Sequence, residues 1–421
     1  MTPEDSDRLT ATASSAPASA RRRVAPAACV LMLGAALLAP FASGMAAQLA
    51  FLTSTTGLGK LADWPDAGGN SGLAAGDAIC AARASAANLP DPQTFVAWLS
   101  DDTNDAYCRL HGFGGKKADN CGQATLPTGA GPWQRTDGMP FMGVIDQVPN
   151  TGAVYTPMNR DEYGHEVGAE TFYAGTQRDG IATGRTCSGW TSNGGEVDIG
   201  QTTETQPGWT EFPGYTFCAQ GYRRIACMQK GAGAPLEPLP HARKQAFVTT
   251  ATFSSNLGAS ALSGGNTGIA AGDAICRNVA ASANLEDAQS YKVYLAAGAD
   301  PAAHFDNDGP WERIDRVPFA DSFAQIHSAY TRAPLNVGET GAIVLGQIAW
   351  NGLLAGGAPA FQDCDHWTST SFNWSGWTAR LPTIGPHWPT SFDTPDSCST
   401  TLASLFCLSD SDRLFRDGLE K

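Results

Sequence analysis

The chain has 421 residues, of which 42% are hydrophobic and 16% are charged, and its formal net charge is −14 at pH 7. A strongly acidic protein is repelled by phosphate backbones and by anionic lipid headgroups. The charge therefore argues against nucleic acid and against an acidic membrane surface as partners.

Residues 1–46 have the pattern of an export signal. A polar start ends in Arg21–Arg23, an apolar run follows from Val24 to Phe41, and small residues close the segment. This order is typical of a secretory signal peptide cleaved near Ala46 or Ala47. A signal anchor that stays in the membrane is the alternative, but the run is at the short end of the roughly 20 residues that span a bilayer. We expect a secreted protein, periplasmic or extracellular, with no membrane span in the mature chain.

One stretch of the chain occurs twice. Gly72–Cys80 returns 196 residues later as Gly268–Cys276, and further matches keep the register on both sides. The chain is therefore predicted to hold two copies of one module. The first copy spans residues 48–228 and the second copy residues 244–408, each a suitable size for one domain. A proline-rich linker, residues 231–243, separates them, and residues 409–421 form a C-terminal tail.

The first copy contains an extra segment. Gly131–Arg135 matches Gly309–Arg313 at an offset of 178 instead of 196, so 18 residues between Leu99 and Gly131 have no counterpart in the second copy. We call the region between Leu99 and Gly131 the insert.

Within each copy the residue pattern changes along the chain. Phe51–Thr56 and Phe247–Thr252 are rich in β-branched and aromatic residues and are predicted strands. Leu73–Ala87 is rich in alanine, has apolar positions at helical spacing and is a predicted helix. Phe95–Leu99 is predicted to begin a second, shorter helix after Pro92. Glycine, threonine, serine, tryptophan and proline dominate the remainder of each copy, which predicts short strands joined by long loops and an α+β order.

The cysteines predict disulfides. Eleven become ten when the signal removes Cys29, and an even number in an exported chain is typical of disulfide bonding. Cys108 and Cys121 lie in the insert, which is most simply bridged within itself. Metal binding is the alternative, but the chain has neither a C-x2-C pair nor a suitably spaced histidine, so we expect no metal and no cofactor. The other cysteines are matched between the copies, Cys80 with Cys276, Cys187 with Cys364, Cys218 with Cys398 and Cys227 with Cys407.

As a set, these motifs resemble the bacterial DUF1554 family, whose domain is grouped with the C-type-lectin-like and endostatin-like folds. The resemblance covers both copies and implies two tandem C-type-lectin-like domains, each with two helices and a loop-rich antiparallel sheet. The motifs that carry it, here in the first copy, are the Gly72–Cys80 helix, Trp98–Ser100, the aromatic-x-Gly of Tyr173–Gly175, the Cys-x-x-Trp-Thr-Ser of Cys187–Ser192 and the C-x8-C of Cys218 and Cys227.

The resemblance also implies how the cysteines pair. In that fold the cysteine of the helix joins the last cysteine, and the two middle cysteines join each other. Carried over to this chain, the implied pairs are Cys80 with Cys227, Cys187 with Cys218, Cys276 with Cys407 and Cys364 with Cys398.

The loops depart from those of the sugar-binding C-type lectins, which hold Ca2+ with carboxylates in the long loop. Between Gly175 and Cys187 the only acid is Asp179, and the matching stretch before Cys364 has only Asp363. Ca2+ needs six to eight oxygen ligands, several of them from carboxylates. Asp306–Gly309 resembles half of a calcium loop, but proline follows at once and we predict a turn there. Any ligand binding is expected to be independent of Ca2+.

Ionisable residues are densest at Asp161–Glu166, where His165 and Glu166 could form an acid–base pair or a metal site. The second copy has Leu335–Glu339 near this place and no histidine, which favours a solvated loop. No H-E-x-x-H or G-x-S-x-G motif occurs, and all ten mature cysteines have a structural assignment. No catalytic residue is therefore predicted.

Tryptophans fall into two groups. Those shared by the copies, Trp133 with Trp311 and Trp190 with Trp367, are expected in the core. Trp374 and Trp377 have no obvious counterpart, and exposed aromatic rings stack on sugars or anchor protein partners. Together with His165 and Glu166 they are the candidate ligand-binding residues.

These patterns favour a secreted, non-catalytic binding or adhesion protein that recognises an extracellular protein or glycan through its loops. Two alternatives stay open. One is an extracellular hydrolase that acts on a surface polymer with the 161–166 cluster, and the other is a structural component of the cell surface.

Overall fold

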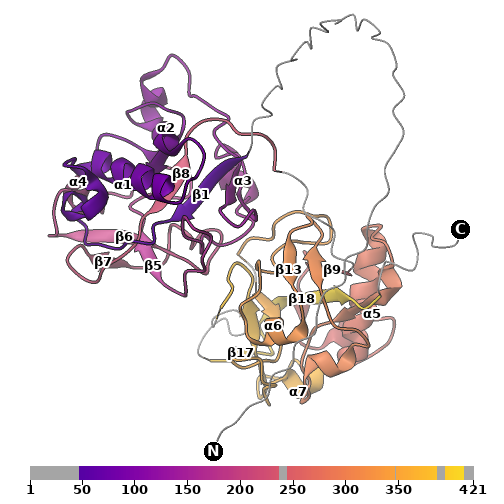
Figure 1. The fold of residues 1–421 in the computed structure, drawn as a ribbon. Helices are drawn as coiled ribbons and strands as arrows, with labels where there is room; N and C mark the ends of the chain where they lie inside the picture. The colour runs from indigo at the N-terminus through magenta and orange to yellow at the C-terminus, as the bar shows by residue number, and fades with distance from the viewer. Residues whose placement is uncertain (1–46, 237–243, 347, 386–393, 412–421) are drawn as a thin grey trace, which may run out of the picture. The chain divides into compact units, whose positions relative to one another are not determined.

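The structure is a computed structural model of the chain (Figure 1), and it describes residues 47–236, 244–346, 348–385 and 394–411. The signal peptide predicted over residues 1–46 lies outside the described residues. So do positions 237–243 of the linker and 412–421 of the tail.

In the first copy, the first and last strands lie side by side in a five-stranded sheet of order β2-β8-β1-β3-β4. β1 runs antiparallel to β8, with Phe51 opposite Cys227, and parallel to β3, with Leu49 opposite Gln134. A smaller sheet of order β5-β6-β7 belongs to the loop-rich half. The strands are β1 (Gln48–Leu52), β2 (Phe95–Ala97), β3 (Trp133–Arg135), β4 (Pro140–Met142), β5 (Thr171–Tyr173), β6 (Glu196–Gln201), β7 (Tyr215–Phe217) and β8 (Ala226–Gln229).

The second copy repeats this pairing. β9 runs antiparallel to β18, with Phe247 opposite Cys407, and parallel to β12, with Gln245 opposite Glu312. The sheet continues through β14 and β16, while β10 and β11 also pair with β18. The strands are β9 (Lys244–Val248), β10 (Phe253–Ser254), β11 (Tyr291–Val293), β12 (Trp311–Arg313), β13 (Pro318–Ala320), β14 (Ile348–Trp350), β15 (Ser375–Gly376), β16 (Thr378–Arg380), β17 (Asp396–Ser397) and β18 (Leu402–Ser409).

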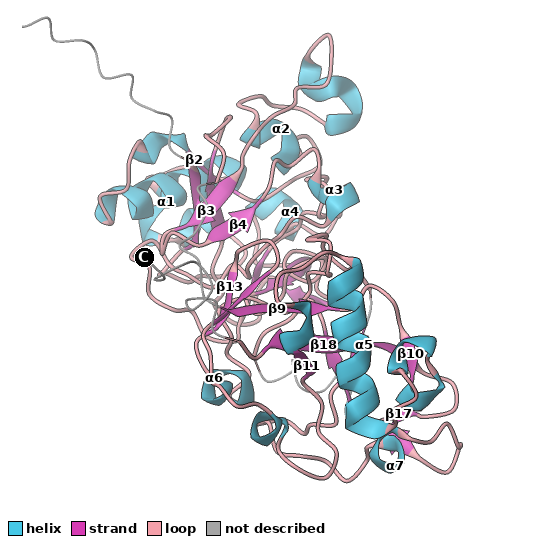
Figure 2. Cartoon of the chain, turned by 90° about the vertical axis from the view of Figure 1, so that its right-hand side faces the viewer, coloured by secondary structure: helices cyan, strands magenta, loops and turns pink. Residues whose placement is uncertain are grey.

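One long helix packs on the sheet of each copy, α1 (Gly72–Ala86) in the first and α5 (Gly268–Ser282) in the second. Figure 2 shows α5 alongside β11 and β18. The helices α2 (Ala106–Leu110), α3 (Val148–Thr151), α4 (Cys187–Trp190), α6 (Phe323–His327) and α7 (Cys364–Trp367) have only four or five residues each. Among the described residues, no helix has both the length and the apolar character needed to cross a membrane.

The repeated motif explains why the long helix lies so close to its neighbouring strand. A Cβ atom at Gly76 would lie 3.0 Å from the Cβ of Ala97, and one at Gly272 would lie 2.7 Å from a side-chain carbon of Val293. Glycine is therefore needed at this helix position for the observed approach, which any larger side chain would prevent.

Two expectations about secondary structure are wrong. Phe95–Ala97 is the strand β2 and not the start of a helix, although a short 3-10 helix at Pro92–Thr94 precedes it. Phe95 and Val96 favour a strand, and all three residues of β2 are buried between α1 and the core. The sheets are also not purely antiparallel, because β3, β12 and β14 each pair with a parallel neighbour. The described chain has a mixed α+β fold with few helices, several sheets and disulfides.

The structure contains five disulfides, the same pairs that the resemblance and the insert indicated. The first of them joins α1 to β8, and its counterpart joins α5 to β18. These two bonds enclose 147 and 131 residues, and on the chain-entropy model each stabilises by about 4–5 kcal/mol. The pairs are Cys80–Cys227, Cys108–Cys121, Cys187–Cys218, Cys276–Cys407 and Cys364–Cys398.

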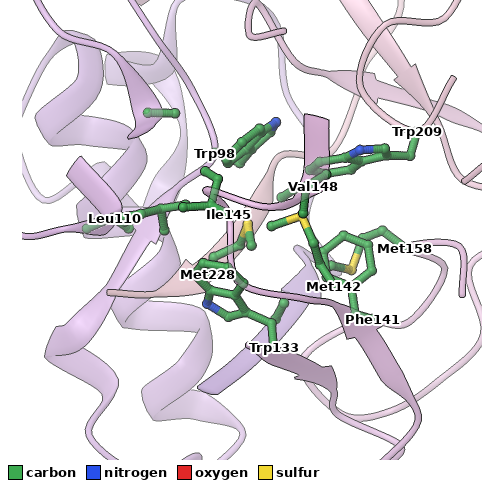
Figure 3. Packing of buried hydrophobic residues seen from close by; sticks show 14 of the residues in the cluster. Trp98, Leu110, Trp133, Phe141, Met142, Ile145, Val148, Met158, Trp209 and Met228 are labelled. Carbon is green, nitrogen blue, oxygen red and sulfur yellow. The ribbon is translucent and has the colours of Figure 1, made fainter. Parts of the chain in front are cut away.

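Apolar side chains are buried on both faces of the main sheet. Along β1, Ala50 and Leu52 belong to one buried cluster and Phe51 to another, as the alternation of a strand requires. Figure 3 shows the cluster of Ala50 and Leu52, in which the rings of Trp98 and Trp209 lie 5.1 Å apart. The tryptophans shared by the copies are fully buried, as expected, at Trp133, Trp190, Trp311 and Trp367.

A buried arginine at the end of the third strand organises the next loop of the first copy. The guanidinium of Arg135 pairs with Asp137 at 2.6 Å and donates to the side chain of Asn159 at 2.6 Å. Arg313 of the second copy makes the same contacts with Asp315 and Asn336. Burial by itself would raise the pKa of Asp137, but the charge and hydrogen bonds of Arg135, with further hydrogen bonds from Arg160 and the backbone of Met139, hold it below the usual value.

Replacing Asp137 by asparagine should remove a pH-dependent part of the stability. The lowered pKa means that the carboxylate stabilises the fold above its unfolded pKa, and this stabilisation is lost as the pH falls through the folded pKa. We expect Asp137→Asn to lower the free energy of unfolding by about 1–3 kcal/mol at pH 7. The difference between variant and parent should shrink from pH 7 to pH 3, measured by denaturant titration with the disulfides intact. The control is Asp102→Asn at an exposed position. A loss of unfolding free energy in Asp137→Asn that does not change with pH would contradict this account.

Candidate functional site

The predicted cluster at 161–166 is a surface turn. One carboxylate oxygen of Asp161 accepts hydrogen bonds from the backbone N–H groups of Tyr163 and His165, both at 2.9 Å. The His165 side chain is 76% exposed, and its Nδ1 lies 3.4 Å from Asp161. Glu166 is 55% exposed and lies 3.4 Å from Arg160. His165 and Glu166 are thus not brought together in a cavity, and the solvated-loop interpretation describes this segment.

The buried acid of this cluster has a structural role. Glu162 accepts a hydrogen bond from the backbone N–H of Ser54 at 2.8 Å and forms an ion pair with Arg83 at 3.0 Å. Glu339 of the second copy accepts from the backbone N–H of Thr250 at 2.9 Å, at the matching place after the first strand. The glutamate therefore attaches a loop to the strand end in both copies.

The described residues contain no group of three or more histidine, cysteine, aspartate or glutamate side chains that could hold a metal ion. The half calcium loop at Asp306–Gly309 forms a bend. The backbone N–H groups of Asp306 and Asn307 donate to Asp410 at 2.9 and 3.0 Å, so this carboxylate caps the loop.

The two candidate tryptophans lie in a loop region of the second copy with other aromatic side chains. Trp374 is 43% exposed, whereas Trp377 is half-buried with its Nε1 3.3 Å from the side-chain oxygen of Gln362. Phe361 and Phe372 are more exposed, at 93% and 82%. These two phenylalanines were not predicted from the sequence, although large apolar residues in a loop rich in glycine, serine and threonine are a usable signal.

The first copy has a groove in the corresponding half. It has a volume of about 550 Å³ and is lined mainly by the loop after β5 and by the loop between β6 and β7. Its lining residues include no histidine and no cysteine. They are Pro149, Gln177, Arg178, Asp179, Thr183, Arg185, Asp198, Thr210, Glu211, Phe212 and Gly214.

Two arginine–carboxylate pairs line the groove. Arg178 contacts Glu211 through two guanidinium nitrogens, at 2.6 and 2.9 Å, and Glu211 also accepts the backbone N–H of Arg178. Arg185 pairs with Asp198 at 2.9 Å, and its guanidinium lies 4.7 Å from the ring centre of Tyr215. The groove thus offers N–H donors next to carboxylate acceptors, close to an exposed aromatic ring.

The insert packs against the turn that carries Arg178. The backbone N–H of Tyr107 donates to the carbonyl of Gly180 at 3.1 Å, and Lys117 donates to the carbonyl of Asp179 at 2.9 Å. Gly180 has a positive φ of 84°, and a Cβ there would lie 2.7 Å from the Cβ of Tyr107. The insert, closed by its own disulfide, therefore holds one wall of the groove in place.

The second copy has the same turn with different side chains. The backbone N–H of Gln177 donates to the carbonyl of Ile181 at 2.8 Å, and Leu354 donates to Ala358 in the same way at 2.8 Å. At the offset of 177 residues set by Cys187 and Cys364, the positions of Gln177, Arg178, Asp179 and Arg185 hold Leu354, Ala355, Gly356 and Gln362. The backbone of the turn is thus retained, while the charged side chains belong to the first copy alone.

No protein-family model matches this sequence, and no curated protein does either.

The exposed aromatic residues should be dispensable for folding. Replacing Phe361 by serine should change the free energy of unfolding by no more than about 0.5 kcal/mol, because the ring is almost fully solvated. Replacing the buried Trp367 by alanine should cost about 3–5 kcal/mol, because it leaves a cavity in the core. Thermal and denaturant unfolding would measure both. A large loss of stability at Phe361 would mean that this ring is packed and not available to a ligand.

Proposed function

We propose that the chain is an exported, non-catalytic binding protein with two C-type-lectin-like copies that differ in their loop surfaces. The observation that carries the proposal is the turn shared by the copies, which presents charged side chains in the first and apolar side chains in the second. A retained backbone with changed surface residues is what recognition by variable loops requires.

The groove of the first copy supports a glycan as the ligand. Sugar hydroxyls both donate and accept hydrogen bonds, and each arginine–carboxylate pair presents a donor beside an acceptor. The lining has two arginines and three acidic residues, so its charge is nearly balanced and favours a neutral ligand. Phe212 and the neighbouring Tyr215 offer ring faces for stacking. The volume of about 550 Å³ lies within the usual range for a small-ligand site.

The hydrolase alternative depended on the cluster at 161–166. That cluster is a surface turn and does not support hydrolysis. A protein is the alternative ligand to a glycan. Ca2+ has no part in the proposal.

The proposal predicts that glycan binding depends on the groove. The full-length mature protein, applied to a glycan array, should bind neutral glycans equally with and without EDTA. Arg178→Ala should weaken binding at least about tenfold, because it removes a charge-assisted donor and leaves Glu211 without its side-chain partner. Phe361→Ser, at the corresponding turn of the second copy, is the matched control and should bind as the parent does.

Two results would count against a glycan in the groove. One is a silent array combined with capture of a protein that Arg178→Ala abolishes. The other is glycan binding that Arg178→Ala leaves intact.

A further inference from the structure

An aspartate of the repeated motif has the same backbone contact in both copies. Asp77 on α1 accepts the backbone N–H of Ala97 at 2.9 Å, and Asp273 on α5 accepts the backbone N–H of Val293 at 2.9 Å. Each carboxylate joins the long helix to the neighbouring strand. The two copies differ in the side chain that approaches this carboxylate.

In the first copy, the side chain that approaches the aspartate is an arginine from the insert. Arg109 on α2 is buried and pairs with Asp77 through one guanidinium nitrogen. Its other terminal nitrogen donates to the carbonyls of Ala97 and Leu99, at 2.7 and 2.6 Å. The guanidinium is thus held by one carboxylate and two backbone carbonyls, with its stem covered by protein.

In the second copy a histidine makes the contact with the aspartate, and a cavity lies beside it. His304 approaches Asp273, with its Nε2 2.8 Å from the carboxylate. Beside it lies an opening of about 310 Å³ whose walls include the side chains of Ile269, Leu295 and Pro301 together with Asp300. Leu295 is the counterpart of Leu99, whose carbonyl holds Arg109 in the first copy. The cavity therefore lies next to the place that Arg109 occupies in the other copy.

We propose that this cavity of the second copy binds a guanidinium group on an apolar stem. The first copy supplies such a group from its own insert. In the second copy, which lacks most of the insert, His304 contacts the aspartate and leaves beside it an opening lined by Asp300 and apolar side chains. The shared ligand chemistry is an alkylguanidinium, which exists both as a small molecule and as an arginine side chain on another protein.

The surrounding charges favour a cation. Asp300 lines the cavity and is half exposed. Its carboxylate accepts the backbone N–H of Ala302 at 2.8 Å and lies 3.2 Å from Nε2 of His327. The other nearby basic side chains already face carboxylates, because His304 lies against Asp273 and Lys292 pairs with Asp306 at 3.0 Å and with Asp410 at 2.7 Å. An anionic ligand would meet Asp300 without a free positive partner, whereas a guanidinium would gain a charge-assisted hydrogen bond there.

The apolar walls favour a stem about the length of a side chain. The volume of about 310 Å³ is at the lower end of the range for small-ligand sites. The isoleucine, leucine and proline walls can bury the methylene groups of such a stem and remove them from water.

The test is titration of the full-length mature protein with butylguanidinium, followed by the methyl resonances of Ile269 and Leu295. Butanol and butyrate, with the same stem, are the comparison probes. We expect butylguanidinium to bind at least about fivefold more tightly than either, because only its head group pairs with Asp300. Equal binding of butanol, or tighter binding of butyrate, would overturn the proposal.

Two variants locate the binding. Ala303→Leu narrows the cavity at an exposed lining position, so the fold should tolerate it. Asp300→Asn removes the charge while its side-chain oxygen can still cap the helix. Both should weaken butylguanidinium binding at least about fivefold by loss of space or of charge. Arg178→Ala, in the groove of the first copy, should leave it unchanged, so this test succeeds or fails independently of the glycan proposal. Binding that survives both cavity variants would overturn the assignment.

A second probe, a blocked tripeptide with arginine between two glycines, tests whether the guanidinium belongs to a small molecule or to an arginine side chain of another protein. Binding of the tripeptide as tight as that of butylguanidinium assigns the cavity to an arginine side chain of a protein partner. Binding at least about tenfold weaker assigns it to a free small molecule, because the peptide backbone would then clash with the rim. If neither probe binds, the proposal is wrong.

Discussion

Each copy depends on the pairing of the strand that begins it with the strand that ends it. β1 lies against β8, and β9 lies against β18, with a cysteine in each final strand. The disulfide from that cysteine to the long helix fixes the third element of the unit. Closure of this kind joins distant parts of the sequence, and the disulfide lowers the entropy of the unfolded chain.

Once the ends are closed, the intervening loops can change without loss of the scaffold. Buried contacts that recur in both copies, such as Arg135 with Asn159 and Arg313 with Asn336, attach the loops at a few points. Between these points the surfaces diverge. The first copy has a charged groove and a filled guanidinium position, while the second has exposed aromatic rings and an open cavity.

The repeated motif shows what could be predicted from the sequence and why. Its glycine lies against the close strand, its aspartate accepts a strand N–H group, and its cysteine joins the last cysteine. The helix itself was predicted from local pattern alone, because its alanines and apolar positions recur at helical spacing. Phe95–Ala97 was predicted wrongly because three buried residues carry no periodicity, and tertiary pairing with β8 decides their conformation. The residues that line the groove were not predicted from the sequence. His165 lies on a plain turn, and the groove residues are ordinary polar side chains whose significance comes from being brought together by the fold.

The contact between the insert and Gly180 limits how the sequence of the first copy can change in evolution. In the first copy the turn packs directly on Tyr107, and this approach requires that residue 180 has no side chain. Deletion of the insert would leave the wall of the groove unsupported, and a larger residue at 180 would push the two apart. The insert and the groove should therefore be inherited as one unit, gained or lost together when such duplicated chains diverge.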